Sequence, residues 1–193
     1  MTGVQTCALP ISKKLLALGV YVDTTAHYDC LTKWMVVGPF DNPKAGNYAV
    51  ALAPEKEVDL KATYPAKSDK SAAWSSFWGY GEYGSVDLNR ALGKHKDAIA
   101  YAYTTFDFDR PLPVELRFGS PNAIRVFLNG KEVFAREEYH HGQRLDQYVA
   151  KGTLKAGKNT LLVKVCQNDQ KESWAQEWSF LLRICDSAGT PVK

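Results

Sequence analysis

Aromatic side chains in segments rich in glycine and polar residues are the feature of this sequence with the clearest chemical use. A flat ring stacks on the apolar face of a sugar, and nearby polar side chains bind its hydroxyl groups. The chain has five Trp, ten Tyr and eight Phe, and those on predicted strands are assigned to the core. The aromatics on predicted loops, with one arginine, are the candidate ligand-binding residues: Trp78, Tyr80, Tyr83, Tyr139, Arg144 and Trp174. The alternative is that they close the ends of the domain or dock a neighbouring one.

Acidic and histidine side chains meet in the segment AREEYHHGQR, which contains Glu137, Glu138, His140 and His141. Neighbouring strand residues point to opposite faces, so the two histidines could bind one metal ion only from a loop. Glycoside hydrolysis needs two carboxyl groups about 5–10 Å apart across a cleft. No motif marks such a pair, and we therefore expect no catalytic residues and no enzyme activity.

Cysteine spacing gives no sign of a metal centre or of a disulfide framework. Cys30, Cys166 and Cys185 form no C-x-x-C pair, and no Cys/His pattern typical of zinc is present. Cys166 and Cys185 are expected on the outward side of two late strands, too far apart for a disulfide bond. The sequence predicts no cofactor.

Charge and hydropathy exclude two further classes of function. The net charge of the 193 residues is only +3, and Lys, Asp and Glu are interspersed along the chain, so no basic stripe for nucleic acid is present. No apolar run approaches the roughly 18–20 residues that a membrane span requires.

The first residues, MTGVQTCALPI, resemble the translation of a short-read sequencing adapter, because its codons give these eleven residues in order. We expect residues 1–12 to be foreign to the protein, with no disulfide partner for Cys7, and the chain to be a fragment of a longer protein. Residues 13–30 are expected to be the tail of an upstream element or a linker, with a short docking strand VYV at 20–22 as the alternative.

Strand patterns with period two fill most of residues 31–190, the predicted domain. Short alternating runs occur at 97–108, 113–120, 145–149, 161–165 and 180–184, with a hairpin at 123–136. Asn129-Gly130 is a preferred pair for the tight turn of that hairpin. Residues 44–73 are expected to form a surface connection with one short strand near 58–60. The predicted fold is all-β, an antiparallel β-sandwich.

Several motifs carry a family resemblance over about residues 31–190. WMVVGPFDN at 34–42, VFLNGKEV at 126–133 and LKAGKNTLLVKV at 154–165 together resemble a galactose-binding-like jelly roll. The sequence is especially similar to the sugar-binding domain of family 2 glycoside hydrolases. The GPF opening resembles modules appended to large secreted bacterial proteins, often after HEAT-like helical repeats.

The resemblance implies a non-catalytic, carbohydrate-binding-like module of an extracytoplasmic bacterial protein. Its partners would be a glycan and other domains of the parent protein. The alternative is a structural or interaction module that packs against a helical-repeat or catalytic domain and binds no sugar. A structural calcium ion is common in this fold, and Asp41, Asn42 and Asp87 are the candidate ligands. The matched motifs specify strands and turns and do not mark a ligand site.

Overall fold

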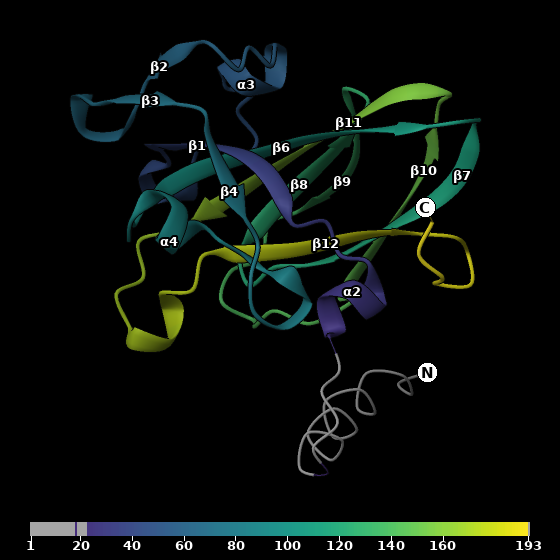
Figure 1. Ribbon diagram of the computed structural model, residues 1–193. Coiled ribbons are helices and arrows are strands. Elements are labelled where there is room, and N and C mark those ends of the chain that lie inside the picture. Colours follow the sequence, from purple (N-terminus) through teal and green to yellow (C-terminus); the bar gives the residue numbers. More distant parts are fainter. Residues whose placement is uncertain (1–17, 19–22, 193) are drawn as a thin grey trace.

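Two antiparallel sheets form the body of the protein, which a computed structural model describes at Leu18 and residues 23–192 (Figure 1). The larger sheet has six strands in the order β4-β1-β6-β11-β8-β9, and the smaller has the order β10-β7-β12-β5. The strands of the larger sheet are β4 (Ser75–Trp78), β1 (Lys33–Asp41), β6 (Ala98–Phe108), β11 (Gly157–Gln167), β8 (Ala123–Leu128) and β9 (Lys131–Arg136). Those of the smaller are β10 (Tyr148–Leu154), β7 (Leu112–Gly119), β12 (Ser179–Cys185) and β5 (Val86–Asp87). The predicted antiparallel β-sandwich is confirmed.

Alternating apolar residues fill the space between the two sheets. Val163 of β11 pairs with Val126 of β8 and with Ala102 of β6, and all three belong to the same buried cluster. Phe118 and Phe180 face them from the smaller sheet. Because strand side chains alternate, Leu162, Lys164 and every other residue of the same parity must face away from this core.

The β8–β9 hairpin forms where the sequence predicts it. Asn129 and Gly130 join the strands with φ angles of 52° and 78°, which are the two positive values that a type I′ turn requires. Asn129 also bonds to β11, since its side-chain oxygen accepts from the backbone N–H of Thr160 at 3.0 Å.

A third layer covers the outer face of the six-stranded sheet. It comprises η1 (Pro43–Ala45), α3 (Ala53–Lys56), β2 (Thr63–Pro65), η2 (Lys67–Asp69) and β3 (Ser71–Ala73). Figure 1 shows β2, β3 and α3 on the side of that sheet opposite β12. Phe40, Tyr101 and Phe127 of the sheet are buried together with Tyr64 and Trp74 in a second apolar cluster.

The expectation for residues 44–73 is therefore only partly right. Residues 58–60 form no strand, and a small β2–β3 hairpin lies further along the segment. The segment is more than a surface connection, because it buries an apolar sheet face that would otherwise meet water.

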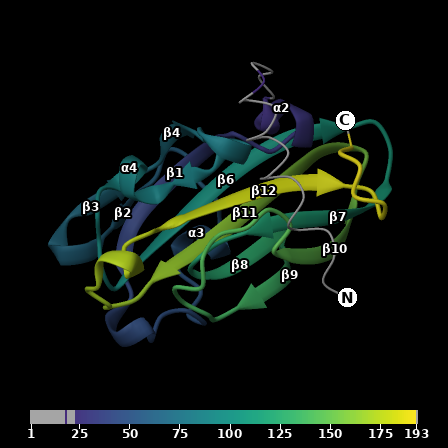
Figure 2. The same ribbon diagram turned by 90° about the horizontal axis from the view of Figure 1, so that it is seen from below.

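Two short helices and two helical turns complete the described part, one of the turns being η4 (Ser173–Ala175). α2 (Thr24–Tyr28) precedes β1 and contacts η3 (Glu82–Gly84), while α4 (Leu88–Leu92) follows β5. Figure 2 shows α2 and α4 well apart from one another. The predicted docking strand at 20–22 and nearly all of residues 1–12 and 13–22 lie outside the described residues. Among the helices of the described part, none is long and apolar enough to cross a membrane.

A candidate ligand-binding groove on the outer sheet face

A groove of about 440 Å³ lies where the third layer leaves part of the six-stranded sheet uncovered. Its floor comes from β4, β1 and β6, and Lys158 of β11 lies at its border. Val58 and Leu60, which follow α3, also line it. The outward side chains of the floor are Lys33, Met35, Ser76, Trp78, Tyr103 and Thr105. The groove therefore combines an apolar floor with hydroxyl and ammonium groups, the composition of a small-ligand site.

Trp78 is the exposed aromatic residue of this groove. It is the last residue of β4 and pairs with Lys33, the first residue of β1. Its neighbour Phe77 packs into the core, so strand alternation directs Trp78 to the outer face. Trp78 is 60% exposed, and the ammonium group of Lys33 lies 4.8 Å from the ring centroid. This cation–π contact holds a positive charge beside an aromatic surface.

Met35 and Tyr103 form the apolar part of the floor beside Trp78. They are opposite one another in the β1–β6 pairing, and Met35 is also opposite Ser76 of β4. Burial raises the pKa of Tyr103 above its usual value. At neutral pH its hydroxyl is therefore uncharged and able to donate a hydrogen bond to a ligand.

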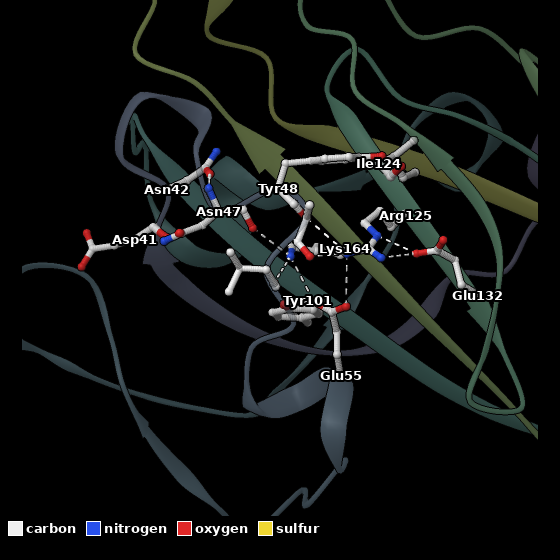
Figure 3. Close-up of polar contacts among 12 residues, drawn as sticks. Asp41, Asn42, Asn47, Tyr48, Glu55, Tyr101, Ile124, Arg125, Glu132 and Lys164 are labelled. Carbon is white, nitrogen blue, oxygen red and sulfur yellow. Dashed lines mark hydrogen bonds and ion pairs between the residues drawn. The ribbon is translucent and has the colours of Figure 1, made fainter.

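Glu55 anchors the segment that carries Val58 and Leu60. It belongs to α3, and its carboxylate accepts hydrogen bonds from Lys164 at 3.0 Å and from Tyr101 at 2.6 Å (Figure 3). Burial and this hydrogen bond raise the pKa of Tyr101 well above its usual value. Because Val58 is only three residues beyond Glu55, the same contacts fix this side of the groove.

Lys164 and Arg125 complete this buried polar cluster. The ammonium group of Lys164 also donates to the carbonyl oxygens of Asn47 at 3.1 Å and Val50 at 2.7 Å. Arg125 lies 3.5 Å from the carboxylate of Glu55 and donates to Glu132 at 2.6 Å. These groups bind one another and the backbone, which makes the cluster a structural anchor of the third layer.

The loop residues between β4 and β5 lie elsewhere. Tyr80 is exposed, its hydroxyl donates to Asp87 at 2.8 Å, and the guanidinium of Arg90 lies 4.3 Å from its ring centroid. Tyr83 was expected on an exposed loop, but only 9% of it is accessible. It packs against Tyr28, and burial raises its pKa to about 12.

Trp174 lies at the other end of the sandwich, on η4 (Ser173–Ala175), and is 63% exposed. The ring of His140 meets it edge-on with 5.7 Å between centroids. Tyr139 is half-buried against the apolar cluster under the third layer, and this burial raises its pKa. Arg144 is exposed on the loop before β10, where Gln147 accepts a hydrogen bond from its backbone N–H at 3.3 Å.

The six sequence-predicted residues therefore do not converge on one site. Trp78 is opposite the first residue of β1. The loop of Trp174 begins after Gln167, which is opposite Ala98 of β6, and Ala98 is in turn opposite the last residue of β1. The nine residues of β1 span about 26 Å at 3.3 Å per residue. The structure brings Trp78 together with Lys33, Tyr103 and Lys158, which sequence reasoning missed. The strand pattern gave no signal for them, because Lys33 and Lys158 lie outside the predicted alternating runs and Tyr103 belongs to the apolar side of the run at 97–108.

The three candidate calcium ligands have protein partners. Asp41 pairs with Lys67 at 3.2 Å, and Asp87 accepts from the N–H of Arg90 as the N-cap of α4. Asn42 is fully buried and donates to the carbonyl of Gln167. Within residues 23–192, no three His, Cys, Asp or Glu side chains gather as a metal site would require.

Fold and groove together define a β-sandwich domain with an aromatic, cationic groove on one sheet face. No family model and no curated protein matches the chain. A β-glucosidase from Kluyveromyces marxianus in complex with glucose is similar in structure, with 11% identity, a TM-score of 0.48, and 79% of this chain and 16% of that chain covered. A β-glucuronidase from Ruminococcus gnavus in complex with N1-substituted uronic isofagomine shows 16% identity, a TM-score of 0.47, and coverage of 81% and 29%.

An anti-sigma factor domain-containing protein from Clostridium clariflavum is similar at 10% identity and a TM-score of 0.42, with 83% of this chain and 44% of that chain covered. The chain thus spans less than half the length of each of these structures. With identities of 10–16% and TM-scores below 0.5, these similarities assign no activity to the chain.

Proposed function

We propose that this domain is a non-catalytic carbohydrate-binding module whose ligand lies in the groove beside Trp78. The observation that carries the proposal is the position of this exposed indole at the edge of a groove of about 440 Å³. An indole face supplies stacking area for a sugar ring, and the hydroxyl groups of Tyr103, Ser76 and Thr105 supply hydrogen-bonding partners. The open sheet face suits a segment of a polysaccharide chain.

A second part of the proposal concerns the larger protein that contains this domain. We expect it to serve a larger extracytoplasmic bacterial protein, bringing neighbouring domains to a glycan. This part rests on the family resemblance of residues 31–190, and the groove itself does not bear on it.

Polysaccharide affinity electrophoresis and a glycan array test the proposal. The full chain should bind at least one glycan, and Trp78→Ala should remove most of that binding. Trp174→Ala is the matched control, because Trp174 is equally exposed but lies at the other end of the sandwich. Binding to no glycan would refute the proposal, as would binding that Trp78→Ala leaves unchanged.

A second candidate function is docking of a neighbouring domain through Trp174. Gln167 is fully buried and donates to the carbonyl oxygens of Ala175 and Glu177, both at 3.2 Å. These bonds hold the loop that presents the exposed indole, as a fixed contact residue requires. If Trp174→Ala weakens association with the flanking domains of the parent protein and Trp78→Ala does not, this end of the sandwich is an interface.

A further inference from the structure

Two lysine ammonium groups border the groove. Lys33 opens β1 and lies over the ring of Trp78, and Lys158 lies on β11. Strand β6 lies between β1 and β11, so the backbones of the two strands that carry the lysines are two strand spacings, about 10 Å, apart at the floor of the groove. Both lysines are exposed, and among the described residues neither has a carboxylate within 4.0 Å. Their charges are therefore available to a ligand.

Carboxylates are missing from the lining. The described residues that line the groove include two lysines and no Asp or Glu. Asp107 is opposite Lys158 in the β6–β11 pairing, at the border of the same face, without being part of the lining. Glu57 and Asp59 flank Val58 along the chain and also lie outside the lining. Both charged side chains in the lining are therefore positive, although the net charge of the whole chain is only +3.

A groove of this kind discriminates between neutral and acidic sugars. A neutral sugar uses the indole and the hydroxyl groups but leaves both ammonium groups in water. A sugar that carries a carboxylate keeps every contact that the neutral sugar makes. Its carboxylate is also attracted to the ammonium groups of the lysines. The spacing of the lysines suits a chain in which such sugars recur.

We propose that the ligand of this groove is an acidic glycan, a polysaccharide that contains uronic acid residues, with Lys33 and Lys158 as the residues that select its carboxylates. This inference rests on the proposed function and specifies its ligand class. Trp78 provides the stacking surface, and the two lysines provide the preference for negative charge.

The test compares acidic polysaccharides with their own neutral derivatives. Polygalacturonate, alginate and hyaluronan are each paired with the same polymer after chemical reduction of its carboxyl groups. Affinity electrophoresis and calorimetry then measure the full chain and its Lys33→Gln and Lys158→Gln variants. Lys151→Gln is the matched control, because Lys151 is an exposed lysine on β10 of the other sheet.

We expect binding to at least one acidic polymer and at least tenfold weaker binding to its reduced form. Each groove lysine variant should lose about fivefold in affinity, the size of one exposed ion pair, and Lys151→Gln should lose little. Asp107→Asn should strengthen binding, since it removes the carboxylate that borders the groove. Added salt should weaken binding to the acidic polymer.

Other outcomes separate the two proposals. Equal binding of an acidic polymer and its reduced form, still lost in Trp78→Ala, would overturn the acidic preference and leave carbohydrate binding intact. Binding that falls equally in Lys151→Gln and the groove variants would show a general charge effect and would overturn the assignment to Lys33 and Lys158. Binding to no polymer would overturn both proposals.

Discussion

The ammonium group of Lys164 lies 3.0 Å from the carboxylate of Glu55, and both side chains are almost completely buried. Lys164 projects from the middle of the six-stranded sheet, and Glu55 comes from the short helix α3, with its carboxylate directed toward Lys164 (Figure 3). The pair connects residues 109 positions apart in the chain. The pair therefore attaches the third layer to the sheet, and residues of that layer line one side of the groove.

Loss of one member of this pair should destabilise the protein strongly. Lys164→Met leaves the Glu55 carboxylate buried without its closest cation, and we expect the free energy of unfolding to fall by about 3–5 kcal/mol. Replacing both residues, as Lys164→Met with Glu55→Leu, should recover much of the loss. Urea denaturation measures both values. Lys151→Met on the exposed side of β10 is the control, and an equal loss in that variant would contradict the argument.

The anchor should also control the order of local unfolding. In Glu55→Ala, helix α3 loses its side-chain contacts with Lys164 and Tyr101, so residues 44–73 should open before the sandwich does. Limited proteolysis under native conditions should cut within this segment first and leave the strands of the two sheets intact. Simultaneous degradation of the whole chain would show instead that the third layer and the sandwich unfold together.

The effect of the Lys33 charge on the surroundings of Trp78 can be measured without any ligand. Two tryptophans of the described residues are strongly exposed, Trp78 and Trp174. The variant Trp174→Phe leaves Trp78 as the exposed tryptophan, and the variant Trp78→Phe leaves Trp174. Fluorescence quenching by iodide relative to caesium should be higher in Trp174→Phe, because Lys33 attracts the anion to the Trp78 ring. Adding Lys33→Gln should lower the ratio. Equal ratios in all variants would remove the electrostatic argument for the groove.

Buried thiols should make the protein sensitive to alkaline pH. Burial raises the pKa of Cys30 and Cys166 to about 12 from an ordinary value of 9.0. Above pH 9 the unfolded chain releases these protons while the folded chain keeps them, so the free energy of unfolding falls between about pH 9 and 12. Below pH 9 the two thiols contribute no such dependence.

Urea denaturation at pH 8 and pH 10.5 tests this dependence. The Cys30→Ala variant should lose less stability between the two values than the parent chain, since one of the buried thiols with a raised pKa is gone. At pH 8 the buried thiols should also resist a thiol reagent until denaturant is added. Cys7 lies outside the described residues and is replaced by Ser for the reactivity assay. An identical pH dependence in Cys30→Ala would contradict the assignment.

Gly119 should not tolerate a side chain. A Cβ atom at this position would lie 2.0 Å from the backbone carbonyl oxygen of Arg144, well inside contact distance. Gly119→Ala must therefore displace the loop before β10 or the end of β7, and we expect a loss of at least about 2 kcal/mol in urea denaturation. Gly130→Ala is the comparison: its Cβ would meet open space, and only its positive φ of 78° opposes the substitution. A smaller loss for Gly119→Ala than for Gly130→Ala would contradict this account.

Strand alternation and turn chemistry carried the prediction of the sandwich. Leu161, Val163 and Val165 alternate toward the core as their spacing indicates, and Asn129-Gly130 turns the hairpin. These features depend on neighbours within a few residues, so the sequence alone determined them. The prediction that Trp78 lies on a loop was wrong: the glycine that follows it directly suggested a loop, but Trp78 is the last residue of the edge strand β4.

Tertiary structure alone decided the third layer and the groove. The apolar outward residues Ile99, Tyr101 and Leu162 required a cover, but the period-two pattern does not say which segment provides it. Lys164 stands at an outward strand position and reads as a solvent-exposed lysine until Glu55 is placed above it. Lys33, Trp78 and Lys158 come together only through strand order, which depends on pairings between distant residues. The sequence by itself therefore determined the strands and the kind of side chain that a ligand would need, and long-range packing decided which of those side chains meet.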